Sequence, residues 1–94
     1  MFPRITRVRH LKDYELELGF SDGTVAQLDF RGRIVGRGGV FLALESMDFF
    51  KQVAVDAEAG TVAWPNGVDF CPDVLFAAAT GRAITELGAE LEVA

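Results

Sequence analysis

Apolar side chains occupy every second position between residues 14 and 30, on both sides of a Ser21-Asp22-Gly23 segment. This alternation predicts two antiparallel strands joined by a three-residue loop, in which Phe20 faces Thr24 and Gly23 takes the positive φ of the turn. The register then gathers the large side chains on one face of the hairpin. The pairs predicted on that face are Leu18 with Ala26, Leu16 with Leu28, and Tyr14 with Phe30.

The other face of this hairpin places Glu15 opposite Asp29, and two like charges in direct opposition destabilise a sheet. We therefore expect a basic side chain nearby. The segment from Arg4 to Arg9 predicts a first strand. If a turn over residues 10–13 brings the chain back so that Val8 faces Tyr14, Arg7 lies beside Glu15. The side chains of this strand expected to face inward are Thr6 and Val8. The acids expected to be solvated, and not to bind a metal, are Glu15, Glu17 and Asp29.

The segment from Arg31 to Gly39 interleaves glycine with arginine and predicts a mobile basic loop. It lacks the Lys-Ser/Thr ending of a phosphate-binding P-loop and the spacing of a dinucleotide-binding fingerprint. Glycines expose backbone N–H groups and arginines bind carboxylates in a bidentate manner, so the loop could also grip an acidic partner surface. The partner-binding candidates are Arg31, Arg33 and Arg37, and the alternative is an ordinary solvated connection.

The second half of the chain predicts a helix, two strands and a last helix. Apolar side chains three residues apart between Val40 and Met47 indicate a short amphipathic helix. Residues 50–56 and 61–64 indicate antiparallel strands, with Val55 facing Val62 and Val53 facing Trp64. The last helix is expected to begin with Cys71 as cap, Pro72 first and Asp73 in the first turn, and to end at Gly81. Its predicted apolar side is formed by Val74, Leu75, Ala78 and Ala79.

These elements predict one α+β domain over residues 1–81, in which about five antiparallel strands form a small sheet with two short helices. The expected order is β-β-β-α-β-β-α. Residues 82–94 are expected to form a C-terminal tail, whose pattern allows a weak helix, a partner-binding tail or disorder.

The Pro65-Asn66-Gly67 turn is a second candidate site, because these residue types hold polar groups in a fixed geometry. The candidate recognition residues are Trp64, Asn66 and Asp69. The structural alternative is that Trp64 belongs to the core, that Asn66 satisfies its own turn, and that Asp69 accepts backbone hydrogen bonds.

Few residues in the chain suit catalysis or metal binding. A single cysteine, Cys71, and a single histidine, His10, exclude an intrachain disulfide and leave too few soft ligands for structural zinc. Nothing in the sequence brings His10 and Cys71 together, so we expect no enzyme, no cofactor and no metal. The polar groups weighed for chemistry with them are Asp22, Asn66, Asp69 and Asp73. No apolar run approaches the roughly 20 residues that cross a bilayer, and no signal peptide is expected, which favours the cytoplasm.

The charge is negative overall and unevenly distributed. Nine basic and fourteen acidic residues give a net charge of -5, which disfavours general binding to nucleic acid. Residues 1–37 hold seven basic and five acidic groups, whereas residues 38–94 hold two and nine. Such a dipolar chain is suited to oriented docking with a charged protein, although solvation alone would also account for the charges.

Several positions together form a family pattern. They are Pro3-Arg4-Ile5, Asp13-Tyr14-x-Leu16-x-Leu18-x-Phe20-x-Asp22-Gly23, Asp29, Phe41, Leu44, Phe50, Trp64-Pro65-Asn66-Gly67-x-Asp69 and Pro72. Over about residues 3–80 the chain resembles DUF2442, a family of small bacterial α+β domains of unknown function. The resemblance implies no catalytic residue. Some members carry a helix-turn-helix domain, for which this chain is too short, and some are thought to lie beside another small protein in a toxin-antitoxin-like arrangement.

Three functions remain open. The first is a non-catalytic protein-binding or regulatory module, antitoxin-like by analogy, whose partner is a small protein encoded nearby or a second copy at an exposed strand edge. The second is a nucleic-acid-binding accessory protein, which requires the basic N-terminal strand and the Arg31–Arg37 loop to converge. Its arginines are Arg4, Arg7, Arg9, Arg31, Arg33 and Arg37. The third is a small enzyme or ligand binder near Trp64–Asp69.

Overall fold

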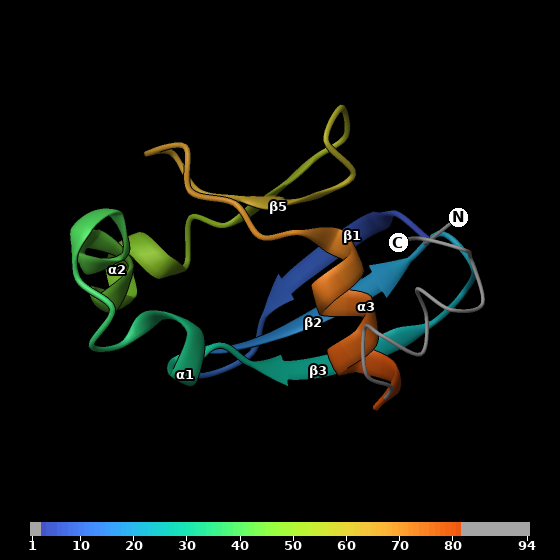
Figure 1. Cartoon of the computed structure of the whole chain (residues 1–94), viewed down its shortest axis with the longest axis horizontal. Helices are drawn as coiled ribbons and strands as arrows, with labels where there is room; N and C mark the ends of the chain where they lie inside the picture. The colour runs from blue at the N-terminus through green and yellow to red at the C-terminus, as the bar shows by residue number, and fades with distance from the viewer. Residues whose placement is uncertain (1–2, 82–94) are drawn as a thin grey trace, which may run out of the picture.

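The structure is a computed structural model, and it describes residues 3–81 of the 94-residue chain. Three antiparallel strands form one sheet in the order β1 (Ile5–His10), β2 (Glu15–Phe20) and β3 (Val25–Asp29). Beside β1 lies a second sheet of β4 (Ala54–Asp56) and β5 (Thr61–Ala63) (Figure 1). The helical elements are α1 (Arg31–Ile34), the 3-10 helix η1 (Gly39–Glu45), α2 (Met47–Phe50) and α3 (Pro72–Thr80). The tail expected at residues 82–94 lies outside the described residues.

The α+β class and the element order are confirmed, but the strands are divided between two sheets and do not form one. β4 pairs with β5, whose Ala63 also forms an isolated antiparallel bridge with Asp69, and Val55 faces Val62 as predicted. Their connection to β1 runs through the turn between them, where the Ile5 N–H donates to the Gly60 carbonyl (2.9 Å). This backbone hydrogen bond, with those that the Arg4 guanidinium donates to the Ala57 and Glu58 carbonyls, joins the two sheets at this turn without continuing the ladder.

The predicted register of the β2–β3 hairpin is confirmed. At the loop end, the Phe20 N–H donates to the Thr24 carbonyl (2.8 Å). At the other end, the Phe30 N–H donates to the Tyr14 carbonyl (2.8 Å). The pairs between these bonds include Leu16 with Leu28, Leu18 with Ala26, and Glu15 with Asp29.

The predicted register of β1 is wrong, because the chain turns back onto β2 later than expected. The Leu11 N–H donates to the Glu15 carbonyl (3.0 Å), and Asp13 has a positive φ of 48° in the turn between them. Arg7 consequently lies opposite Gly19 and not beside Glu15.

A bulge in β1 also overturns the inward position predicted for Thr6. The register shifts between Ile5 and Arg7, so Thr6 is exposed and its hydroxyl donates to the Gly19 carbonyl (3.3 Å). Val8 packs against the core as predicted.

Helical turns replace the expected basic loop and part of an expected strand. Ile34 of α1 is fully buried, so the segment after β3 is anchored to the core. The helix expected from Val40 is the 3-10 helix η1, followed at once by α2. Phe50, expected to begin a strand, ends α2, because its N–H donates to the Ser46 carbonyl (2.8 Å) and its ring is fully buried. Val53 therefore precedes β4 and is not part of the ladder.

Trp64 and Phe50 lie at the centre of the core that joins the two sheets. Their ring centroids are 5.6 Å apart, and the Trp64 Nε1–H donates to the Phe50 carbonyl (2.9 Å). Phe30, the residue after β3, lies 6.4 Å from each of these rings. Trp64 is only 3% exposed, so it is a core residue, in agreement with the structural alternative for its turn.

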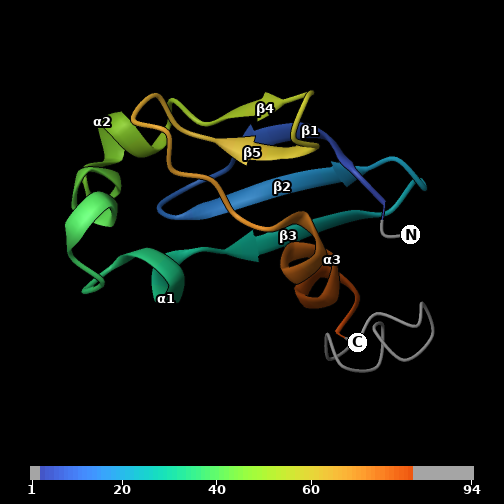
Figure 2. The same ribbon diagram turned by 45° about the horizontal axis from the view of Figure 1, so that its top comes forward.

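Helix α3 begins and ends as predicted, but its buried side differs. Pro72 is the first helical residue, and Gly81 closes the helix in the left-handed conformation (φ 72°). Leu75 is buried as expected, whereas Val74 is exposed and Ala77 is buried in its place. The helix packs against β3, on one face of the larger sheet (Figure 2).

Hydrogen bonds from Thr24 hold the pKa of the Asp22 carboxyl group below its ordinary value. The Thr24 N–H donates to Asp22 Oδ1 (2.9 Å) across the loop in which Gly23 has a φ of 93°. A lowered pKa in the folded state means that the unfolded chain binds the proton more readily. This carboxylate therefore stabilises the fold above the ordinary aspartate pKa, and its contribution is lost as the pH falls through the lowered value.

We expect the substitution Asp22→Asn to reduce the loss of stability on acidification, because asparagine keeps an acceptor oxygen but does not titrate. The measurement is the free energy of unfolding by denaturant at a series of pH values. Asp48→Asn, at an exposed carboxylate of α2, is the matched control. Identical acid profiles for the wild type and Asp22→Asn would contradict this assignment.

Candidate functional site

Residues 31–42 carry most of the exposed large apolar side chains of the described chain, and we call them the 31–42 surface. Val35 is 42% exposed, and Val40 and Leu42 are each 63% exposed. Between residues 3 and 81, the other exposed large apolar side chains are Val25 and Val74. Exposed apolar side chains that gather in one segment are typical of a contact surface.

Three contacts attach the 31–42 surface to the rest of the fold. Ile34 is fully buried, and the Arg31 guanidinium carbon lies 4.9 Å from the centroid of the Tyr14 ring, at cation–π distance. The Gly36 N–H donates to Glu45 Oε2 (3.2 Å), which links the segment to the end of η1. The segment expected to be a basic loop therefore begins with the helical turn of α1 and runs into η1, and it makes defined contacts with the rest of the fold.

The arginines of this surface have no carboxylate partner within residues 3–81. Arg37 donates through Nη2 to the Gly32 carbonyl (3.1 Å), which is a contact inside the same segment. The one ion pair found in this part of the chain joins Arg9 to Glu17 (3.3 Å) on the larger sheet. The guanidinium groups that remain without an acidic partner here are those of Arg31, Arg33 and Arg37.

The turn after β5 separates its predicted recognition residues. Trp64 lies in the core, whereas Asn66 and Asp69 are exposed. Asn66 Oδ1 accepts the Val68 N–H (3.2 Å), so the side chain satisfies its own turn as the structural alternative predicted. Its amide nitrogen, however, donates outside the turn, to the Val40 carbonyl (3.1 Å).

This last hydrogen bond brings the two candidate sites together. Asn66 and Asp69 line an open depression of about 280 Å³, and its other wall is formed by Val40 and Phe41 of η1. One wall of the depression thus belongs to the 31–42 surface, and the other belongs to the turn that contains Asn66. The sequence contained both regions, but no local signal showed that they are neighbours.

The DUF2442 family model, described as a protein of unknown function, matches residues 5–81 of the chain. The chain belongs to the DUF2442 family. The matched range begins with β1 and ends at the C-cap of α3, so it includes every element of the described fold. No curated protein and no solved structure matches this DUF2442 chain.

The DUF2442 fold places the two groups considered for nucleophilic chemistry in separate environments. His10 Nε2 is 2.8 Å from the Asp13 carbonyl, and its ring lies against Phe50. Cys71 is exposed at the start of α3, which packs against β3. No hydrogen bond joins these two groups within the described range, and no metal-binding cluster of His, Cys, Asp and Glu side chains occurs there.

The arginines considered for nucleic-acid binding are divided among three places in the DUF2442 structure. Arg4 donates to the carbonyls of Ala57 and Glu58 in the β4–β5 turn. Arg7 and Arg9 lie on the outer face of the larger sheet, and the remaining arginines belong to the 31–42 surface. The arginines that this function requires on one face are therefore carried by different elements of the fold.

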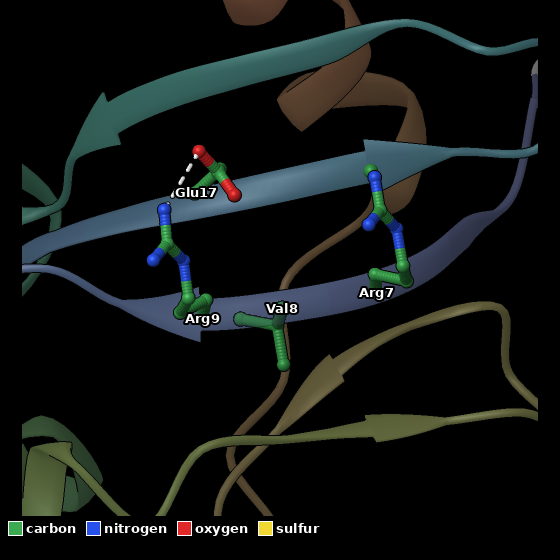
Figure 3. Close-up of a pocket in the computed structure, with 5 residues that line it drawn as sticks. Arg7, Val8, Arg9 and Glu17 are labelled. Atoms are coloured by element: carbon green, nitrogen blue, oxygen red, sulfur yellow. Dashed lines mark hydrogen bonds and ion pairs between the residues drawn. The ribbon is translucent and has the colours of Figure 1, made fainter.

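The outer sheet face carries a feature that sequence reasoning missed. Arg7 extends from β1 across Gly19 of β2, in a shallow depression of about 470 Å³ that Arg9 and Glu17 also line (Figure 3). A Cβ atom at Gly19 would lie 3.0 Å from Arg7 Nε, so the glycine makes room for the guanidinium. A glycine in the interior of a strand is the sequence signal of such a close approach, but the wrong β1 register concealed its partner.

Among the helices of residues 3–81, none combines the length and the apolar character that a membrane span requires.

We expect the substitution Asn66→Asp to weaken the attachment of the turn to η1, since aspartate keeps the acceptor for Val68 and loses the donor to Val40. The loss of one exposed hydrogen bond corresponds to about 0.5–1.5 kcal/mol of unfolding free energy. Amide exchange of residues 39–45 should become faster in the same variant. Asn66→Ala, which removes both bonds, should be the less stable of the two. If exchange in η1 is unchanged in both variants, this contact does not hold η1 in place.

Proposed function

We propose that this DUF2442 protein is a non-catalytic protein-binding module with an antitoxin-like regulatory role, and that it binds its partner through the 31–42 surface. The observation that carries the proposal is the combination of exposed Val40 and Leu42 with arginines that have no acidic partner among residues 3–81. Burial of the apolar side chains would supply affinity, and the guanidinium groups would supply orientation and specificity.

The chemistry of the surface indicates the partner. A protein that fits here presents an apolar patch edged by aspartate or glutamate side chains, because arginine forms bidentate contacts with carboxylates. The open depression between η1 and the Asn66 turn would accept one apolar side chain of that partner. In our proposal the partner is a small protein encoded nearby in a bacterial genome, and the complex forms in the cytoplasm, where a single exposed Cys71 stays reduced.

Binding to nucleic acid is the second candidate. Its support is limited to the same three arginines and Arg7, since Arg4 is bonded to backbone carbonyls and Arg9 is paired with Glu17. The net charge of -5 opposes it at long range. Ligand binding near Asp69 is supported only by the open depression that Asn66 and Asp69 line.

The test begins with the full-length tagged chain, used to capture partners from its native host at low and moderate salt. The affinity of the purified partner is then measured for two variants of the 31–42 surface, Leu42→Ser and Arg37→Glu. Each should weaken binding roughly tenfold or more, as expected for a residue at the centre of an interface. The matched controls are Val74→Ser, at an exposed apolar residue of α3, and Lys51→Glu, at an exposed basic residue after α2.

Equal affinities for the surface variants and their controls would exclude the 31–42 surface as the binding site. Capture of nucleic acid alone, with an affinity that falls steeply with salt, would replace the proposal with the second candidate.

A further inference from the structure

We propose that β3 pairs in antiparallel fashion with β3 of a second copy of this chain, about a two-fold axis at Gln27. The two three-stranded sheets would then form one continuous sheet. In this register Gln27 lies opposite Gln27 of the second copy, and Val25 lies opposite Asp29. The proposal is independent of the partner-binding proposal, since β3 ends before the 31–42 surface begins.

The hydrogen bonds of the hairpin show which backbone groups of β3 remain unpaired. In an antiparallel pair, hydrogen-bonded and non-hydrogen-bonded positions alternate. The bonds of Phe20 with Thr24 and of Phe30 with Tyr14 fix this alternation, so residues 26 and 28 bond to β2. The N–H and C=O groups of Val25, Gln27 and Asp29 consequently point away from β2. Within residues 3–81, no backbone hydrogen bond reaches them.

The edge of β3 lacks several of the features by which natural proteins shield a strand edge, although helix α3 packs against this strand. Its sequence, VAQLD, contains no proline and no lysine, and its pairing with β2 contains no bulge. Its two inward side chains, Ala26 and Leu28, are uncharged. Figures 1 and 2 show no other strand along this edge of the sheet.

The charges of the outer sheet face provide the argument for a second copy. Glu15 and Asp29 lie opposite each other, and no basic side chain of residues 3–81 forms an ion pair with either. Asp29 Oδ1 accepts only the uncharged N–H of Arg31 (2.9 Å). Two rows along the same face, beyond the row of Arg9, Glu17 and Gln27, Arg7 lies over Gly19 and also has no carboxylate partner in this part of the chain (Figure 3).

The proposed axis joins these two unbalanced rows. The row of Arg7, Gly19 and Val25 continues, across the axis, into Asp29 and Glu15 of the second copy. Gly19 has no side chain and Val25 is uncharged, so nothing acidic or basic stands between the guanidinium and the two carboxylates. The symmetry creates this complementary row twice in each dimer, which is the self-complementarity that an isologous interface requires.

Two other symmetric registers match the charges less well. An axis at Asp29 would bring two copies of Asp29 together, with Glu15 beside each of them. An axis at Leu28 would extend the acidic row into the row of Gln27 and Glu17, whose arginine is already paired. The axis at Gln27 also pairs β3 over its full length.

Cysteine cross-linking tests the register in the full-length chain. In a background with Cys71→Ser, the variant Gln27→Cys should form a disulfide-linked dimer on mild oxidation, because hydrogen-bonded partners in a ladder have Cα atoms about 5.5 Å apart. Val25→Cys is the matched control, since its two copies would lie four residues apart, at about 13 Å. Equal cross-linking of both variants, or none of Gln27→Cys, would overturn the proposed register.

Sedimentation equilibrium over a range of protein concentrations tests the dimer itself. We expect the wild type to dimerise, and Arg7→Gln to weaken the dimer roughly twofold at low salt, because two exposed charge interactions over about two strand spacings are lost. Arg33→Gln, on the 31–42 surface, should leave dimerisation unchanged. A chain that stays monomeric at all concentrations would overturn the proposal, as would a monomer whose Val25, Gln27 and Asp29 amides are protected from exchange. Failure here leaves the partner-binding measurements unaffected, so the two proposals are tested separately.

Discussion

The buried contact between Trp64 and Phe50 is the constraint on which the rest of this structure depends. An indole N–H taken out of water needs an acceptor, and here the acceptor is the Phe50 carbonyl (2.9 Å). Phe50 can present that carbonyl because α2 ends at this residue. The strand that follows is therefore shorter than its apolar pattern suggests. The same ring pair, with Phe30, fills the space between the two sheets and the helical segment at one end of the larger sheet.

The core contact also determines what the surface presents. With the Trp64 ring buried, the next three residues must turn outward, and this turn brings Asn66 to the Val40 carbonyl. Ile34 and Leu44 are fully buried on either side of the exposed Val35, Val40 and Leu42. The 31–42 surface can expose apolar side chains and keep a defined structure because Ile34 and Leu44 pack in the core on either side of them.

Two surfaces of the molecule carry charged side chains that have no partner of opposite charge among the described residues. The arginines of the 31–42 surface have no carboxylate there, and Glu15 and Asp29 share the outer sheet face without a basic partner. Unpaired charges in water have little effect on stability, so folding alone does not require their arrangement. Both features are consistent with a small domain that works by contact.

The sequence by itself determined the α+β class, the order of elements, the β2–β3 register and the limits of α3. These features depend on neighbours along the chain: alternation across one turn, a proline at a helix start and a glycine at its end. The tertiary structure alone decided the β1 register, the division into two sheets, the end of α2 at Phe50 and the meeting of Asn66 with Val40. Because the chain turns back through Asp13, Arg7 pairs with Gly19 and not with Glu15 as predicted. The apolar pattern of the strand permits either pairing. Hydrophobic periodicity specifies which face of an element is buried, whereas contacts between segments far apart in the chain are chosen by how the complete core packs.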